Sequence, residues 1–128
     1  MFKFVLFVLC ALHAVNSKIS LSRFNDPKIL AAFSTCSTLH KLEIGDLLET
    51  LDKGDGDENM KKYNMCLYKA VNAIDSNNKV NKEVITQYLK IFYPDHFQQI
   101  LDKCVKDVIS NIEEAYQISA CTSTLVKN

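Results

Sequence analysis

The residues of this 128-residue sequence that are best suited to chemistry are its five cysteines. Cys10 stands in an apolar run at the N-terminus. The other four are spread over the rest of the chain: Cys36, Cys66, Cys104 and Cys121. An even number of cysteines in a small secreted chain predicts disulfides, and four cysteines permit three pairings among which their spacing does not choose. The alternative is zinc, because Cys36 and His40 could share one helical face, but no CxxC pair accompanies them.

Two acidic loops invite a comparison with calcium-binding EF-hand loops. That register needs a glycine at its sixth position and a glutamate at its twelfth. A loop counted from Asp55 has Met60 at the sixth position, and a loop counted from Asp75 has Val80 there. Neither loop fits, so helix capping and turn formation explain these acids, and no metal site is predicted.

The sequence has little that could serve an enzyme. Outside the N-terminal run it has two histidines, His40 and His96, with no glycine-flanked serine elbow and no glycine-rich loop for a phosphate. His96 is expected to be an exposed residue in the first turn of a helix. A pH-sensing role is the alternative, because imidazole titrates near neutral pH. The sequence therefore predicts neither catalysis nor a cofactor.

The N-terminus has the features of a secretory signal. Lys3 precedes an apolar run, residues 4–15, that is too short to span a membrane, and Val15 and Ser17 are small enough to precede a cleavage site. We expect residues 1–17 to be a signal peptide and residues 18–128 to be one secreted, extracellular domain with no membrane span. Removing Lys3 from the 15 basic residues leaves 14 against 15 acidic residues, a formal net charge of −1. Neither sign forms a long block, which argues against nucleic acid as a partner.

Helices are expected to position these residues, because apolar side chains recur at helical spacing and no segment alternates in the manner of a strand. The apolar stripes cover residues 29–36, 44–51, 60–74, 84–92, 97–108 and 112–121. Residues 53–56 form a glycine-marked turn, and the tail, residues 122–128, is too short and polar to be predicted as a helix. Four residues can cap helices: Asp26, Asp57, Asn81 and Asn111. Glu114 can complete a capping box with Asn111, and the expected fold is all-α with six short helices.

With the cysteines placed, the sequence resembles the insect odorant-binding proteins of the pheromone-binding and general odorant-binding family. Members usually have six cysteines, with three residues between the second and third and eight between the fifth and sixth. Counting back from Cys66 reaches Lys62 in place of the second cysteine, and counting back from Cys121 reaches Ile112 in place of the fifth. These two missing residues are partners in one family disulfide, so the pattern is similar to the four-cysteine "minus-C" subgroup.

Shorter motifs carry the same resemblance along nearly all of residues 18–128. The turn Lys53-Gly54-Asp55, the segment after Cys66 and the segment Glu114-Ala115-Tyr116 are similar to the corresponding family segments. The interval between Cys104 and the position of the fifth cysteine is a little shorter than the family pattern.

The resemblance implies that Cys36 pairs with Cys66 and that Cys104 pairs with Cys121, within six helices around a central apolar cavity. It also implies that no disulfide joins the third helix to the sixth. Only packing around Ile112 and the aliphatic stem of Lys62 is expected to hold these two helices together. We expect this contact between the third and sixth helices, called the seam below, to open more easily than in six-cysteine relatives.

The resemblance further implies a carrier that reversibly binds small hydrophobic molecules, odorants or pheromones, for olfactory transport. Candidate ligand contacts are Phe33, Leu67, Ile74, Val84, Tyr88, Leu89, Phe92, Ile100, Leu101, Val108, Ile112, Ala115, Tyr116 and Ser119. Tyr88, Tyr116 and Ser119 could offer a hydroxyl to an alcohol, aldehyde or ester, although a buried Tyr116 could instead bond to the backbone. A guest of about 15–20 non-hydrogen atoms at roughly 0.3–0.4 kcal/mol each would bind with a Kd near micromolar or weaker.

Two other functions stay open at this point. The same scaffold could act outside olfaction, in saliva, venom or reproductive fluid, where it would carry or sequester a lipid or a small amine. Alternatively, the apolar stripes could form a filled core, as in most helical domains, in a cavity-free secreted effector that binds another protein. The expected partners are a small hydrophobic ligand and a chemoreceptor, with the protein a monomer or weak dimer.

Overall fold

The computed structural model describes residues 26–54 and 56–127. Six helices lie in these ranges: α2 (Pro27–His40), α3 (Ile44–Lys53), α4 (Glu58–Ala70), α5 (Lys82–Phe92), α6 (Phe97–Cys104) and α7 (Ile112–Lys127). The described ranges contain two isolated β-bridges and no strand, which confirms the predicted all-α fold. None of the described helices has the length and apolar character needed to cross a bilayer. The predicted signal peptide, residues 1–17, lies outside the described residues.

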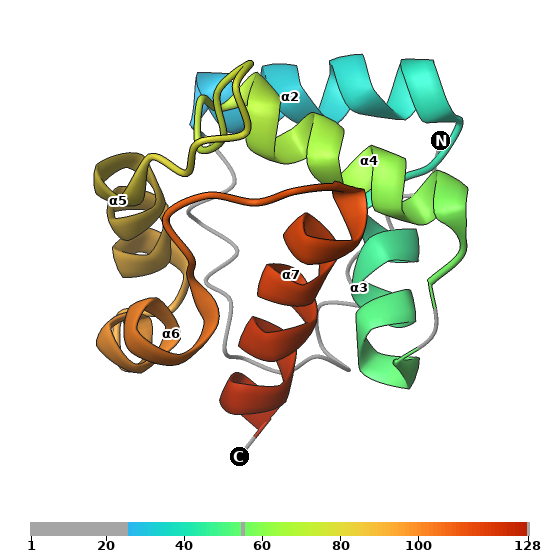
Figure 1. Ribbon diagram of the computed structural model, residues 1–128. Helices are drawn as coiled ribbons and strands as arrows, with labels where there is room; N and C mark the ends of the chain where they lie inside the picture. The colour runs from blue at the N-terminus through green and yellow to red at the C-terminus, as the bar shows by residue number, and fades with distance from the viewer. Residues whose placement is uncertain (1–25, 55, 128) are drawn as a thin grey trace.

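Helix α7 runs through the middle of the molecule, as Figure 1 shows. It packs against α4 near its N-terminal end, against α3 on one side and against α6 on the other. Helix α2 lies along α4, and α5 lies beside α6. Each helix therefore has at least one neighbouring helix to cover its apolar stripe.

The local signals for helix boundaries form as predicted. Asp26, Asp57 and Asn81 each accept a hydrogen bond from a first-turn N–H group, at 2.8, 2.8 and 3.2 Å. These bonds satisfy N–H groups that the helix itself leaves free. Helix α3 ends at the glycine-marked turn, where Gly54 takes a φ of 81°, a left-handed conformation that glycine adopts without a Cβ clash.

Helix α4 is shorter than its apolar stripe predicted. It ends at Ala70 instead of continuing to Ile74, because Asn72 takes a φ of 64° and turns the chain out of the helix. Ile74 is still buried, but it reaches the core from a loop, where it forms a bridge with Val80. A turn, and not a helix, therefore places this apolar side chain in the core.

Helix α6 is also shorter than predicted, for a similar reason. It ends at Cys104, and Val105 already has extended backbone angles (φ −102°, ψ 124°). Val108 lies in the following loop, which forms a bridge with Lys79 of the loop after α4. The two loops provide hydrogen-bond partners for each other's backbone groups. Residues 105–108 therefore do not need a helix to satisfy theirs.

Helix α7 begins as predicted and runs further. Asn111 accepts a hydrogen bond of 3.0 Å from the Glu114 N–H group. The Glu114 carboxylate accepts a hydrogen bond from the backbone N–H of Ser110, one residue before the one that a capping box would use. The tail that was not predicted as a helix continues α7 to Lys127. Val126 is buried and the Lys127 ammonium donates to the Asp52 carbonyl oxygen at 2.8 Å. Packing against α3 thus stabilises a segment whose own sequence favours a helix only weakly.

Both predicted disulfides are confirmed. Cys36 is bonded to Cys66, which ties α2 to α4, and Cys104 is bonded to Cys121, which ties α6 to α7. Their sequence separations of 30 and 17 residues correspond, in the chain-entropy description, to about 3–4 kcal/mol of stability each.

Polar contacts join α4 to α7. The Lys61 ammonium lies 2.6 Å from a Glu113 carboxylate oxygen and 5.7 Å from the centre of the Tyr116 ring. The prediction that only packing around Ile112 and the stem of Lys62 holds these helices together is therefore wrong. It missed these contacts because nothing in the sequence shows that Lys61 and Glu113 face each other.

Candidate ligand-binding cavity

An apolar cavity of about 230 Å³ lies between the helices, and all six of them contribute to its wall. It lies between two groups of buried side chains. One group surrounds the Cys36–Cys66 disulfide and contributes Leu47 to the cavity wall. The other group contributes Ile100 and Ile118 to the wall. The six helices therefore enclose space that their own side chains do not fill.

Half of the predicted ligand contacts lie on this wall. They are Phe33, Leu67, Tyr88, Leu89, Phe92, Ile100 and Ser119. They come from α2, α4, α5, α6 and α7, which are far apart in the sequence and meet only in the folded chain.

The other predicted contacts do not line the cavity. They are Ile74, Val84, Leu101, Val108, Ile112, Ala115 and Tyr116. Ile74 and Ala115 are core residues, while Val84, Leu101 and Ile112 pack against that core. Val108 is 58% exposed because it lies in the loop after α6. The apolar stripe of each helix is thus wider than the part that faces the cavity.

Tyr116 packs elsewhere in the protein. It belongs to the buried group around the Cys36–Cys66 disulfide, and its hydroxyl end lies against Gly56. A Cβ atom at position 56 would stand 2.6 Å from the Tyr116 Oη atom. The glycine is therefore needed at this point to leave room for the tyrosine.

Two parts of the wall were not predicted from the sequence. Helix α3 contributes Leu47 and Leu51, and the end of α7 contributes Thr122, Ser123 and Val126. The apolar stripe of α3 was visible in the sequence, but nothing there showed that it faces a cavity. The α7 residues were missed because the tail was not predicted to be helical.

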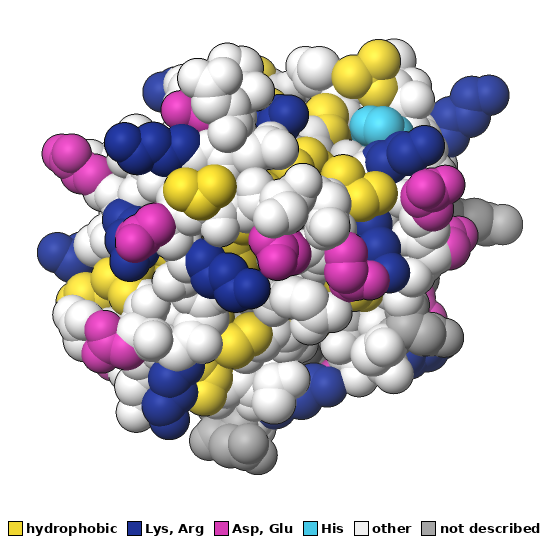
Figure 2. All heavy atoms as spheres, in the orientation of Figure 1, with side chains coloured by type: hydrophobic (Ala, Val, Ile, Leu, Met, Phe, Trp, Pro, Cys, Tyr) yellow, Lys and Arg dark blue, Asp and Glu magenta, His cyan; other side chains and the backbone are white. Residues whose placement is uncertain are grey.

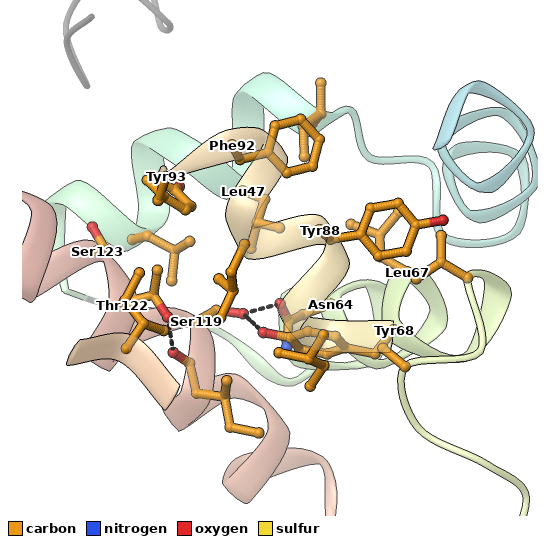
Figure 3. A pocket seen from close by; sticks show the side chains of 18 of the residues that line it. Leu47, Asn64, Leu67, Tyr68, Tyr88, Phe92, Tyr93, Ser119, Thr122 and Ser123 are labelled. Carbon is orange, nitrogen blue, oxygen red and sulfur yellow. Dashed lines mark hydrogen bonds between the residues drawn. The ribbon is translucent and has the colours of Figure 1, made fainter. Parts of the chain in front are cut away.

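Two polar residues of α4 were also missed, Asn64 and Tyr68, which lie on the wall close to Ser119. Figure 3 shows the three side chains meeting among the wall residues. The Ser119 hydroxyl donates to Asn64 Oδ1 at 2.7 Å, and the Tyr68 and Ser119 hydroxyl oxygens lie 2.7 Å apart. This cluster of Asn64, Tyr68 and Ser119, called the polar cluster below, is a hydrogen-bonded point in an otherwise apolar wall.

Burial keeps the tyrosines near this cluster protonated. It raises the pKa of Tyr68 to about 12, against a smaller opposing effect of the hydrogen bond with Ser119. Burial and the neighbouring Tyr68 likewise raise the pKa of Tyr93, another wall residue, to about 12. Tyr88 also lines the cavity, and Figure 3 shows its hydroxyl pointing away from the polar cluster. The wall therefore presents neutral phenols at physiological pH.

The size of the cavity limits the guest. At about 30 Å³ for each water-sized atom, 230 Å³ holds about eight non-hydrogen atoms. This is fewer than the 15–20 non-hydrogen atoms expected from the sequence.

Metal chemistry has no support in the described part of the chain. No group of three His, Cys, Asp or Glu side chains there is arranged to hold a metal ion. The zinc alternative is wrong, because Cys36 is bonded to Cys66, while His40 lies edge-on to the Tyr63 ring at 6.4 Å between centroids. His96 is half-buried at the start of α6 and does not line the cavity.

The surface carries both signs of charge. Figure 2 shows lysine and acidic side chains interspersed over the face in view, with no continuous patch of either sign. A second, open groove is lined by Leu39, His40, Lys62, Met65, Cys66, Lys69, Ala70 and Ile112. Lys62 of α4 and Ile112 of α7 thus lie at the same groove.

A family model matches most of the chain. The model of the PBP/GOBP family matches residues 21–124, about four-fifths of the chain. That range contains both disulfides, α2 to α6 and most of α7. Searches of curated proteins and of solved structures gave no match.

Proposed function

Because the chain belongs to the PBP/GOBP family, a family of binding and carrier proteins and not of enzymes, we propose that it is a secreted carrier of odorants or pheromones in olfactory transport. It binds a small hydrophobic molecule reversibly in the cavity between its helices. The ligand is held by burial of apolar surface, and no covalent bond is made or broken.

The observation that carries this proposal is the cavity itself. Helical cores normally pack without voids, and an unfilled apolar space costs stability because its lining loses contacts. Here all six helices surround such a space, and its wall is apolar except for a few hydroxyl and amide groups. A small apolar guest restores the lost contacts, which is the physical basis of binding.

We also propose that residues 1–17 are removed as a signal peptide and that residues 18–128 form the mature extracellular domain. The two disulfides support this, because such bonds persist in oxidising compartments. The mature protein is proposed to be a monomer or weak dimer that delivers its ligand to a chemoreceptor. Mass spectrometry of the secreted protein tests the cleavage site, and a mature N-terminus other than Lys18 would contradict it.

Within the family we propose membership of the four-cysteine "minus-C" subgroup. The support is positional: Lys62 and Ile112, which the resemblance aligns with the missing cysteines, line the same groove beside Cys66. Two residues that replace a disulfide should lie near each other in this way.

Displacement of a fluorescent apolar probe tests the carrier function. Leu89 lies on the cavity wall, so Leu89→Trp should fill part of the space and weaken binding of both probe and ligands about tenfold or more. Leu30→Trp is the matched control, because Leu30 is 48% exposed and off the wall, and it should bind as the wild type does. Equal binding by the two variants, or no probe binding by the wild type, would refute the proposal.

A further inference from the structure

We propose that Asn64 is the hydrogen-bond donor of the cavity, and that the protein selects small apolar guests that carry an acceptor oxygen, such as the carbonyl of a ketone, aldehyde or ester. This inference rests on the proposed carrier function and adds the chemical class of the ligand. It is carried by the polar cluster of Asn64, Tyr68 and Ser119.

Asn64 is polar, buried and incompletely bonded. It is 2% exposed, lies on α4 and lines the cavity. Its side-chain nitrogen, Nδ2, is buried and has no hydrogen-bond partner among the described residues. A buried amide carries two N–H donors, and leaving them unpaired is costly, so such groups in proteins are nearly always satisfied by protein, water or ligand.

The bonds within the cluster fix which end donates. A serine hydroxyl has one proton, and Ser119 uses it to donate to Asn64 Oδ1 at 2.7 Å. The 2.7 Å contact between Tyr68 and Ser119 must then have Tyr68 as the donor. Burial keeps the Tyr68 phenol protonated, with its pKa raised to about 12, so this direction holds at physiological pH. The Asn64 oxygen is thus engaged, and its nitrogen is the group left to bind a guest.

The chemical class follows from this arrangement. A carbonyl oxygen accepts hydrogen bonds and cannot donate one, so it complements the Asn64 N–H groups. A hydrocarbon of the same size fills the same apolar space and leaves these donors unpaired. The Asn64 nitrogen has almost no accessible surface without a guest, so a guest oxygen reaches it by a shift of the Asn64 side chain and then forms a bond from which water is excluded.

The test compares methyl hexyl ketone with nonane, which have equal numbers of non-hydrogen atoms, by displacement of a fluorescent apolar probe. Absolute affinities also reflect the hydration of each compound, so the informative quantity is the change caused by a substitution. Asn64→Leu should weaken the ketone about tenfold and leave nonane within about twofold of the wild type. Tyr63→Phe, which removes a buried hydroxyl of the same helix that is not on the cavity wall, should change neither. A carbonyl-labelled ketone should show a lower infrared stretching frequency in the wild type than in Asn64→Leu.

Ser119→Ala provides a second variant if Asn64→Leu does not fold with both disulfides. Ser119 is a positioning residue, so its loss should weaken the ketone by a smaller factor and spare nonane. An equal effect of these substitutions on both compounds, or an equal loss of ketone binding in Tyr63→Phe, would overturn the assignment of Asn64 while the carrier function stands. Failure of the wild type to bind either compound would overturn the carrier function and this inference together.

Discussion

Lys61 of α4 and Glu113 of α7 form an ion pair in which the Lys61 Nζ atom lies 2.6 Å from Glu113 Oε1. They are the chain neighbours of Lys62 and Ile112, the residues that stand where six-cysteine relatives are expected to have the disulfide between these helices. The same ammonium lies over the Tyr116 ring. A polar contact therefore joins α4 and α7 next to the position at which the "minus-C" proposal places the absent disulfide.

Replacing Lys61 with methionine should loosen this seam. Lys61→Met keeps most of the stem over Tyr116 but removes the charge, so amide hydrogen exchange in the first turns of α7 should become several-fold faster. Lys62→Met is the matched control, because Lys62 is exposed and its ammonium lies 4.0 Å from a Glu58 oxygen within the same helix. Unchanged exchange in Lys61→Met would show that the ion pair does not hold the seam.

Acid should weaken the same contact. The hydrogen bond from Lys61 lowers the pKa of Glu113 from its ordinary value of 4.5, with a further contribution from Gln117. A carboxyl group with a lowered folded-state pKa stabilises the fold above its ordinary pKa, and this stabilisation is lost as the pH falls through the folded-state value. Unfolding midpoints of the wild type and Lys61→Met should therefore converge as the pH falls below 4.5 and through the lowered pKa of Glu113. A constant difference down to lower pH would contradict this prediction.

A third disulfide should form at the groove. In oxidising conditions, Lys62→Cys combined with Ile112→Cys should give a protein with three disulfides, and the long loop that the bond closes predicts up to about 4 kcal/mol of added stability. The same two positions changed to serine provide the control. If the two new thiols stay free in the folded protein, the register that supports the "minus-C" proposal is wrong.

Gly54 and Gly56 should differ in why they resist substitution. Gly56→Ala would place a methyl group 2.6 Å from Tyr116 Oη, so it should destabilise the protein by about 1–3 kcal/mol through overpacking. Gly54→Ala meets open space but takes a φ of 81°, so it should cost about 1–2 kcal/mol through backbone strain alone. In a Tyr116→Ala background, the destabilisation by Gly56→Ala should shrink and the destabilisation by Gly54→Ala should remain. Chemical denaturation of the four variants measures both. Equal costs in both backgrounds would contradict the contact with Tyr116.

Alkaline pH should destabilise the fold through three buried phenols. Burial raises the pKa values of Tyr63, Tyr68 and Tyr93 from 10 to about 12. The folded protein therefore keeps these protons up to a higher pH than the unfolded chain does. The resulting stabilisation is complete below pH 10 and is lost as the pH rises towards about 12. Tyrosinate absorbance followed together with circular dichroism should show late ionisation, with a smaller late step in Tyr68→Phe. Ionisation of all tyrosines near pH 10 without unfolding would contradict this.

The starts of the helices could be predicted because they depend on neighbours in the chain. Asp26, Asp57 and Asn81 bond to N–H groups two or three residues further on, and such contacts form wherever the helix forms. The disulfide pairing was not of this kind. Spacing left three pairings open, and only the resemblance to a family selected the observed one.

Contacts between distant segments decided the rest. Ile74 and Val108 continue helical stripes in the sequence, yet loops that pair with each other hold them outside the helices. The tail of α7 is helical because it packs against α3, and Asn64 meets Ser119 across 55 positions of sequence. A stripe shows that a helix has an apolar face, whereas only the relative placement of six helices determines which part of each face is core and which part surrounds the cavity. The amphipathic helices and their caps are thus a property of the sequence alone, while the cavity and its polar cluster arise from packing between segments that the chain itself keeps far apart.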